Sequence, residues 1–352
     1  MFLLKKTILD KRLANIKTWL SHDLGLDLLS IAPASADASF RRYFRATISE
    51  KSAQSAQLPT IFIVMDSPPE HEDNELFIRC AKLLHKCQLN VPIIFQTHLQ
   101  KGMLILSDLG TQLYQGALNK GSVDSLYHEA FTALLKMQAL TLNNDLTSSL
   151  ESYDALKLAD EMTLFEQWYI QHYQQTNLSD HDSKILTNSM ECLIESALQQ
   201  PQVLVHRDFH CRNLLITADN SPGVIDFQDM VIGPICYDIV SLLKDCYIKW
   251  PAQDVKRWAI EFHQLSLKQG LHSQHDEQQW LKWFDWMGVQ RHLKVLGIFS
   301  RLYFRDGKDQ YMGDIPLVHK YLIDTCEHYP ELSGLAKLLR KYSPKKDLSN
   351  HA

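Results

Sequence analysis

The chain has 352 residues, 45% of them hydrophobic, which is enough for a well-buried core and for two domains or lobes. Thirty-six Lys and Arg residues against 41 Asp and Glu residues give a formal net charge of -5, so the composition does not indicate a nucleic-acid-binding protein. Only Gly25 precedes Gly102 among the 13 glycines, which excludes an N-terminal G-x-G-x-x-G sequence and an N-terminal Walker A loop.

The seven cysteines are odd in number and include no C-x-x-C pair. We therefore expect reduced thiols rather than a disulfide framework or a structural zinc site. The apolar run at the N-terminus is too short for a secretion signal, and no later stretch approaches about 18 apolar residues. These features predict a soluble, cytoplasmic protein with no membrane partner, and they leave its oligomeric state and protein partners open.

The first part of the chain is predicted to be a helix followed by a small sheet. Leucines at helical spacing predict a helix from Leu9 to Leu24 that ends at Gly25. Alternating and short apolar runs then predict strands at residues 40–48, 60–65, 92–95 and 103–106. Acidic residues at 70–73 predict the first turn of a helix that crosses this sheet.

From Ser122 onward the helical period dominates. Helices are predicted at residues 123–137, 154–173, 183–198 and 280–295. Three short strands interrupt them, at residues 203–206, 213–216 and 223–226. This pattern predicts an α+β protein.

The polar residues with the clearest chemistry lie beside these three strands. One strand leads to Asp208, the next begins at Asn213, and a hairpin brings Asp226 alongside. Phosphoryl transfer requires hard oxygen ligands for Mg²⁺ and a carboxylate that accepts the proton of the attacking hydroxyl. The arrangement therefore predicts Asp208 as the catalytic base and Asn213 and Asp226 as magnesium ligands.

Two alternatives remain for this stretch. Asp and Asn also favour turns, so the three residues could be turn formers. His206, Asp208 and His210 alternate like the ligands of a metallohydrolase on one strand face. Asn213 and the strand before Phe227 argue against the hydrolase, which has no need of that spacing.

Two motifs carry a family resemblance. Residues 206–213 resemble the H-R-D-x-x-x-x-N catalytic loop of the protein-kinase-like superfamily, and residues 226–228 resemble its D-F-G. Gly233-Pro234-x-x-Tyr237-Asp238 is more similar to the aminoglycoside phosphotransferase and choline kinase branch. Within that branch, longer segments look like the bacterial anomeric N-acetylmuramate/N-acetylglucosamine kinases. These segments are residues 34–45, 65–69, 206–213, 226–229, 237–247 and 290–297.

The resemblance, which covers about residues 30–320, implies a two-lobed protein-kinase-like fold. Residues 1–106 would form a nucleotide-binding N-lobe with an antiparallel sheet, 107–111 a hinge, and 112–352 a larger, mostly helical C-lobe. The implied activity is ATP- and Mg²⁺-dependent phosphorylation of the anomeric C1 hydroxyl of N-acetylmuramate or N-acetylglucosamine, in peptidoglycan recycling. Phosphorylation of an aminoglycoside or an amino alcohol remains an alternative, and the choice between ATP and GTP stays open.

The expected nucleotide site departs from the kinase pattern. Residues 36–40 replace the glycine-rich loop, and Met65 stands where a lysine is expected. These departures leave a catalytically inactive nucleotide-binding protein as a further alternative. Arg41, Arg42 or Arg45 could supply the missing charge. The residues expected to bind nucleotide are Ser35, Asp37, Ser39, Arg42 and, through hinge backbone groups, Leu106, Ser107 and Leu109.

The acceptor is expected to bind in the C-lobe near Asp208. Residues 291–308 are basic, which favours an N-acetylated, anionic sugar over a polycation. His206 is expected to be structural, and Asp238 to order the catalytic loop by accepting backbone hydrogen bonds. The candidate acceptor-binding residues are His210, Arg212, Asp229, Glu161, Trp168 and Arg291.

Overall fold

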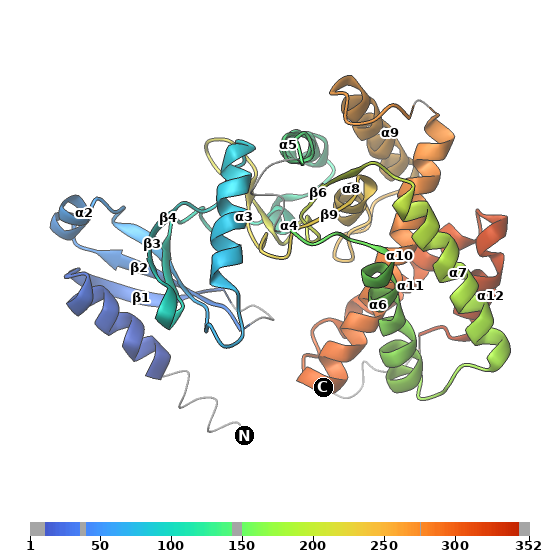
Figure 1. Cartoon of the computed structure of the whole chain (residues 1–352), viewed down its shortest axis with the longest axis horizontal. Helices are drawn as coiled ribbons and strands as arrows, with labels where there is room; N and C mark the ends of the chain where they lie inside the picture. The colour runs from blue at the N-terminus through green and yellow to red at the C-terminus, as the bar shows by residue number, and fades with distance from the viewer. Residues whose placement is uncertain (1–10, 36–39, 143–149, 275, 345–352) are drawn as a thin grey trace. The chain divides into compact units, whose positions relative to one another are not determined.

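The structure is a computed structural model that describes residues 11–35, 40–142, 150–274 and 276–344. The chain divides into two compact units (Figure 1). We call Met1–Gln112 with Leu215–Gln228 the sheet unit, and Leu113–Leu214 with Asp229–Ala352 the helical unit. The roles that the sequence assigns to the lobes and the hinge stay predictions. No helix in the described ranges combines the length and apolar character needed to cross a bilayer.

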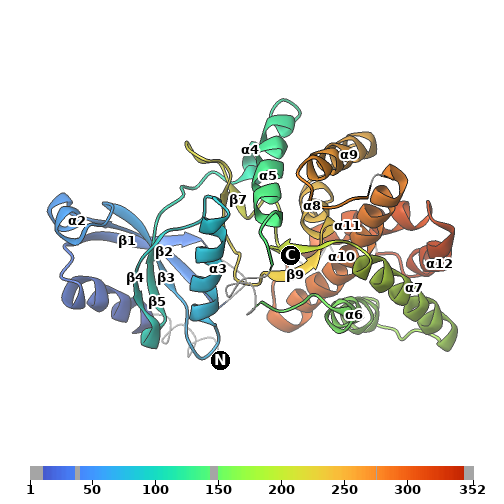
Figure 2. The same ribbon diagram turned by 45° about the horizontal axis from the view of Figure 1, so that its top comes forward.

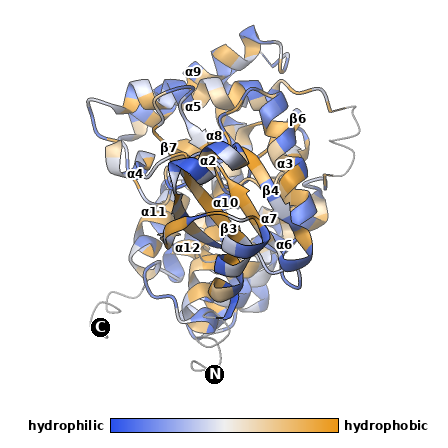
Figure 3. Cartoon of the chain, turned by 90° about the vertical axis from the view of Figure 1, so that its left-hand side faces the viewer, coloured by the Kyte–Doolittle hydropathy of each residue, from blue (hydrophilic) through white to orange (hydrophobic). Residues whose placement is uncertain are grey.

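The sheet unit is built on a five-stranded antiparallel sheet (Figure 2) with strand order β1-β2-β3-β5-β4. The strands are β1 (Leu28–Ser35), β2 (Arg42–Ile48), β3 (Ile61–Asp66), β4 (Ile94–His98) and β5 (Met103–Leu106). The four strands predicted from apolar runs are therefore present, and β1 joins them as the partner of β2. Figure 3 shows the apolar character of β3 against the polar α2 (Glu50–Ala56), which follows β2.

A helix at residues 11–18 continues as the π-helix η1 (Trp19–Asp23) and packs on this sheet. Its Trp19 and Leu20 share a core with inward-facing residues of the strands, including Phe44 and Phe62. Gly25 follows with a φ of +63°, a conformation that suits glycine, so the predicted helix end is confirmed.

The helix α3 (Asn74–Lys86) begins later than predicted. Asp73 is its N-cap, and its side chain accepts a hydrogen bond from the backbone N–H of Leu76 at 2.8 Å. Glu70 and Glu72 consequently precede the helix, and the prediction that they form its first turn was wrong. A capping aspartate satisfies an amide that would otherwise lack a partner, which fixes the start of the helix at this position.

Two short pairs of strands flank the catalytic loop in the sequence, and β6 (Gln202–Val205) with β9 (Val231–Pro234) belongs to the helical unit. β6 pairs antiparallel with β9, a strand that the sequence patterns did not predict. β7 (Leu214–Leu215) pairs with β8 (Gly223–Val224), so the predicted hairpin is present but shorter. β8 ends before Asp226, whose φ of +63° is incompatible with a strand.

Helices make up the rest of this unit. They are α4 (Tyr114–Ala117), α5 (Val123–Gln138), α6 (Ala155–Leu164), π-helix η3 (Phe165–Tyr173), α7 (Asp180–Leu198), α8 (Cys236–Leu243), α9 (Ala252–Lys268), α10 (Glu277–Asp306), α11 (Ile315–Cys326) and α12 (Ser333–Lys341). Short 3-10 turns are η2 (Leu99–Lys101) in the sheet unit, and η4 (Met312–Asp314) and η5 (Pro330–Leu332) here. The predicted helix at 154–173 is confirmed, but it changes to π geometry at Phe165. The helix predicted from 183 starts at Asp180, because Ser179 caps it.

The 30-residue α10 packs against α6, η3, α7, α8 and α11, and it is the central helix of this unit. Gly297 faces Leu164 at the junction of α6 and η3, at a separation that leaves no room for a Cβ atom. Between the same two helices, the ammonium group of Lys294 on α10 lies 2.9 Å from the carboxylate of Glu161 on α6.

Candidate active site

The catalytic loop starts where β6 stops. His206 is fully buried, and its backbone N–H donates a 2.7 Å hydrogen bond to the carboxylate of Asp238 at the start of α8. The N–H of Arg207 donates to the same carboxylate at 3.0 Å. This is the contact that the sequence led us to expect of Asp238. β6 ends at Val205, one residue earlier than predicted, because the amides of His206 and Arg207 bind Asp238 and not the neighbouring strand.

Asp238 holds a strained backbone. Arg207 has a φ of +77°, which is rare for a residue with a side chain. Burial raises the pKa of Asp238 to about 7, against the hydrogen bonds from His206 and Arg207 and the charge of Arg291. The loop conformation therefore depends on a buried carboxyl group that titrates near neutral pH.

Asp208 follows directly and is closed into a compact turn. Its carbonyl oxygen accepts hydrogen bonds from the backbone N–H of His210 and from the side-chain amide of Asn213, both at 3.0 Å. Burial alone would raise the pKa of Asp208, but nearby positive charges, that of Lys294 first, hold this pKa below its usual value. The carboxylate is thus ionised at neutral pH, as a proton acceptor must be.

Asn213 and Asp226 offer the oxygen donors that magnesium prefers. The amide nitrogen of Asn213 is bound to Asp208, which fixes the orientation of its carbonyl oxygen. In the sheet unit, one carboxylate oxygen of Asp226 accepts a 2.8 Å hydrogen bond from Gln228, which orients that side chain. Amide and carboxylate oxygens with no thiolate among them fit Mg²⁺ rather than a softer metal.

The metallohydrolase alternative requires His206, Asp208 and His210 on one strand face. Because β6 ends at Val205, these residues lie in a loop instead. Across the described ranges, no three His, Cys, Asp or Glu side chains are grouped so that they could hold a metal ion. The structure does not support this alternative.

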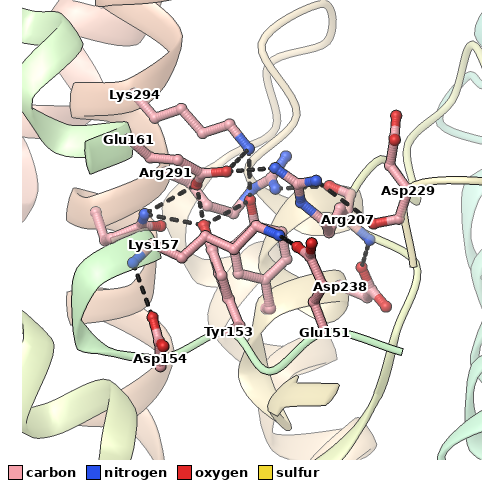
Figure 4. Close-up of polar contacts among 12 residues, drawn as sticks. Glu151, Tyr153, Asp154, Lys157, Glu161, Arg207, Asp229, Asp238, Arg291 and Lys294 are labelled. Atoms are coloured by element: carbon pink, nitrogen blue, oxygen red, sulfur yellow. Dashed lines mark hydrogen bonds and ion pairs between the residues drawn. The ribbon is translucent and has the colours of Figure 1, made fainter. Parts of the chain in front are cut away.

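Two of the candidate acceptor-binding residues are engaged inside the helical unit (Figure 4). Glu161 binds Arg207 and Lys294, and Arg291 donates to the carbonyl oxygen of Arg207 at 2.8 Å and to the hydroxyl of Ser241 at 2.7 Å. Sequence reasoning missed Lys294 as a site residue, although it lies one turn after Arg291 on the same helix.

The remaining candidates in this unit lie in different surroundings. Arg212 stacks on the ring of Tyr247 at 3.4 Å and donates to Gln115 at 3.1 Å. His210 meets the edge of the same ring, and its Nδ1 atom is buried without a hydrogen-bond partner in the described structure. The side chain of Asp229 is exposed. Trp168 stacks on His172 along η3 at 4.5 Å.

In the sheet unit each arginine near the expected nucleotide loop holds a carboxylate. Arg41 pairs with Glu72 at 2.7 Å. Arg42 and Arg12 both bind Asp66, which is fully buried. Asp37 and Ser39 lie outside the described residues, as does the side chain of Ser35.

The predicted hinge is tied to the sheet. Arg45 pairs with Asp108 at 2.5 Å. The N–H of Ser107 donates to the carbonyl oxygen of Ile93 at 2.8 Å, directly after the last paired residue of β5, Leu106. In the described part of the chain, no hydrogen bond uses the backbone groups of Leu109.

An antiparallel sheet unit, a mainly helical unit and an H-R-D-x-x-x-x-N loop anchored by a buried aspartate define a phosphotransferase with a protein-kinase-like fold. The fold is similar to that of choline kinase LicA from Streptococcus pneumoniae, with a TM-score of 0.61 at 11% identity, over 89% of this chain and 99% of that chain. The chain belongs to the phosphotransferase enzyme family, whose sequence model matches residues 30–289.

Two proteins with sequences similar to this chain have the same name. The chain is 38% identical over 341 residues to an N-acetylmuramate/N-acetylglucosamine kinase of Pseudomonas putida, covering 94% of this chain and 96% of the relative. It is 39% identical over 309 residues to a protein of the same name from Pseudomonas aeruginosa, covering 88% and 87%. The family and the kinase-like fold predicted from the motifs are confirmed.

Proposed function

We propose that this protein transfers the terminal phosphoryl group of ATP to the anomeric C1 hydroxyl of N-acetylmuramate or N-acetylglucosamine, in the recycling of cell-wall sugars. The observation that carries the proposal is the catalytic loop, in which Asp208 is held ionised and Asn213 closes the turn beside it. The names of relatives that match nearly the whole chain support the choice of sugar. The proposal places the reaction in the cytoplasm, where ATP is available.

In this proposal, Asp208 accepts the proton of the C1 hydroxyl as that oxygen attacks the phosphorus atom. Asn213 and Asp226 would hold Mg²⁺, which neutralises charge on the phosphate oxygens. Asp238 keeps the loop in its strained conformation, and buried His206 supports the turn by accepting a 3.3 Å hydrogen bond from the N–H of Asp208.

The nucleotide is assigned to the sheet unit and residues 107–111. Hinge backbone groups would bind the adenine edge, with Leu109 the best candidate because its groups have no partner in the described structure and Ser107 uses its N–H on Ile93. Arg42 would bring positive charge close to the phosphates. Ser35, Asp37 and Ser39 complete the proposed phosphate loop.

The acceptor is assigned to the helical unit. His210 has an unpartnered, buried ring nitrogen, so it is the strongest candidate for a hydrogen bond to the sugar. Arg212, Asp229 and Trp168 remain proposed contacts. Glu161 and Arg291 already bind neighbouring protein groups, and we assign them a supporting role.

The test is to incubate the protein with ATP, Mg²⁺ and each free sugar and to identify sugar 1-phosphate by mass spectrometry. Asp208→Asn should lower kcat by about three orders of magnitude, because the proton acceptor is lost. Asp219→Asn, at an exposed position, is the matched control and should leave kcat unchanged.

Three results would contradict the proposal. Phosphorylation of only an aminoglycoside or an amino alcohol would change the assigned acceptor. Nucleotide binding without transfer to any of these compounds would indicate an inactive nucleotide-binding protein. Full activity of Asp208→Asn would remove Asp208 from the mechanism.

A further inference from the structure

Arg207, the residue before the proposed catalytic base, is held at both its backbone and its side chain. Asp238 accepts its N–H at 3.0 Å, and Arg291 donates to its carbonyl oxygen at 2.8 Å. Its guanidinium group binds the carboxylate of Glu161 and reaches the carbonyl oxygen of Asp229 at 3.4 Å. Arg207 has a φ of +77°, so these contacts maintain a backbone conformation that the residue would otherwise leave.

Glu161 has no capacity left for a substrate. One carboxylate oxygen binds Arg207 and, at 2.9 Å, the ammonium group of Lys294. The other accepts hydrogen bonds from the hydroxyl of Tyr153 and, at 3.4 Å, from the amide of Gln290 (Figure 4). Four donors around a residue that is 8% exposed saturate this carboxylate.

Lys294 is equally enclosed. Besides Glu161, its ammonium group donates to the hydroxyl of Tyr237 at 3.0 Å and lies 5.7 Å from the centre of that ring. The residue is 8% exposed. Lys294 therefore balances the buried charge of Glu161 and leaves Glu161 able to hold Arg207.

The charges of Glu161, Lys294 and Arg207 depend on one another. Burial opposes ionisation of Glu161, but the charges of Lys294 and Arg207 outweigh it and hold the pKa of Glu161 below its usual value. Removal of one member leaves a buried charge without compensation, so the remaining side chains must move or change protonation. Arg207 is the member that is joined directly to Asp208.

We infer that Glu161 and Lys294 are positioning residues for phosphoryl transfer: they fix the side chain of Arg207 and, through its strained backbone, the carboxylate of Asp208. The inference rests on the proposed function, and it replaces substrate contact as the role of Glu161. Tyr153 and Gln290 support the same carboxylate from its second oxygen.

The experiment compares Glu161→Gln, Lys294→Met and the double variant with the wild-type chain, measuring kcat, both KM values and the thermal midpoint. Lys282→Met is the control, because Lys282 lies on the same helix but pairs with the half-exposed Glu331. A displacement of about 1 Å at a catalytic group can cost about 100-fold, so we expect kcat to fall about 10- to 100-fold. KM for ATP should stay within about two-fold, since no nucleotide contact is removed.

Two further results separate positioning from general stability. Lys294→Arg keeps the charge beside Glu161 and should retain most of the wild-type kcat. The double variant should lose little more than the worse single variant, because both changes disrupt one unit. If Glu161→Gln does not fold, Tyr153→Phe is the milder variant, because it removes the hydroxyl that donates to Glu161 and accepts from Gln290 but leaves the Glu161 carboxylate in place. It should lower kcat by a smaller factor with an unchanged KM.

The outcomes are distinguishable. A wild-type chain that phosphorylates neither sugar overturns the proposed function, and this inference with it. An active wild type whose variants keep its kcat overturns the inference alone. A rise in KM for the sugar at constant kcat would make Lys294 or Glu161 a substrate contact and would also overturn it. The inference would also be overturned if the unfolded fraction of a variant at the assay temperature accounted fully for its loss of activity.

Discussion

Gly297 on α10 allows a direct test of the close contact between α10 and the junction of α6 and η3 in the helical unit. A Cβ atom at this position would lie 2.5 Å from both the Cβ and the carbonyl oxygen of Leu164, and closer still to the carbonyl carbon. Ordinary contacts are 3.4–4 Å, so Gly297→Ala requires the helices to separate by about 1 Å. Backbone atoms cannot rotate out of the way as a side chain can.

The net effect combines two opposing contributions. Overpacking a rigid contact costs about 3 kcal/mol, while replacing glycine inside a helix gains about 1 kcal/mol. Gly297→Ala should therefore lower the free energy of unfolding by about 2 kcal/mol. For a unit of this size, that corresponds to a fall of about 4–8 °C in Tm, measurable by circular dichroism.

Gly288→Ala is the matched control on the same helix. There a Cβ would meet only the far end of the Lys244 side chain, at 3.1 Å from Cδ and 3.2 Å from Nζ. That side chain can shift by a few tenths of an ångström, so helix propensity decides and stability should stay constant or rise by about 0.5 kcal/mol. If Gly297→Ala proves as stable as Gly288→Ala, the close helix approach is not as described.

Three further predictions concern titration and metal binding. The pKa of Asp238 is about 7 in the folded protein, above the usual 3.8, so the folded state binds the extra proton. The free energy of unfolding should therefore fall as pH rises from about 4 through 7, and Asp238→Asn should flatten this slope in denaturant titrations across that range. Lys341 and Ser179 hold the pKa of Asp182 at about 2, so an NMR titration of Lys341→Met should show this pKa moving towards its usual value; an unchanged midpoint would exclude that cause. EDTA should abolish turnover and Mg²⁺ restore it, with Asn213→Ala requiring a higher Mg²⁺ concentration, whereas activity that survives EDTA would contradict the assigned ligands.

Local patterns predicted those parts of the fold that depend on local chemistry. The strand predicted at 60–65 and the helix predicted at 123–137 each lie within one residue of β3 (Ile61–Asp66) and α5 (Val123–Gln138), because both segments bury a regular face. The loop at 206–213 was recognisable because its motif, H-R-D-x-x-x-x-N, lies within eight consecutive positions. The start of α3 was misjudged because three acidic residues precede the helix, and the local sequence does not show that Asp73 is the one that caps it.

Long-range relations were beyond sequence reasoning. β9 was missed because it is a four-residue strand whose partner β6 lies 26 positions earlier at Val205↔Val231. Glu161 was predicted to bind the acceptor, and its contacts with Arg207 and Lys294 were not foreseen, because these partners are 46 and more than 100 residues away in the sequence. The sequence of one helix does not show which charged residue of another element will contact it in the folded protein.

Two of the non-glycine residues with a positive φ belong to the segments that carry the proposed chemistry. Arg207 and Asp226 both adopt positive φ angles that glycine would adopt without strain. At Arg207 a glycine would lose the side chain that Glu161 holds, and at Asp226 it would lose the proposed metal ligand. The chain instead keeps the functional side chain. At Arg207 two hydrogen bonds stabilise the strained backbone, since Asp238 accepts from its N–H and Arg291 donates to its carbonyl oxygen. Strain of about 1–3 kcal/mol is within the range that two buried, charge-assisted hydrogen bonds can offset.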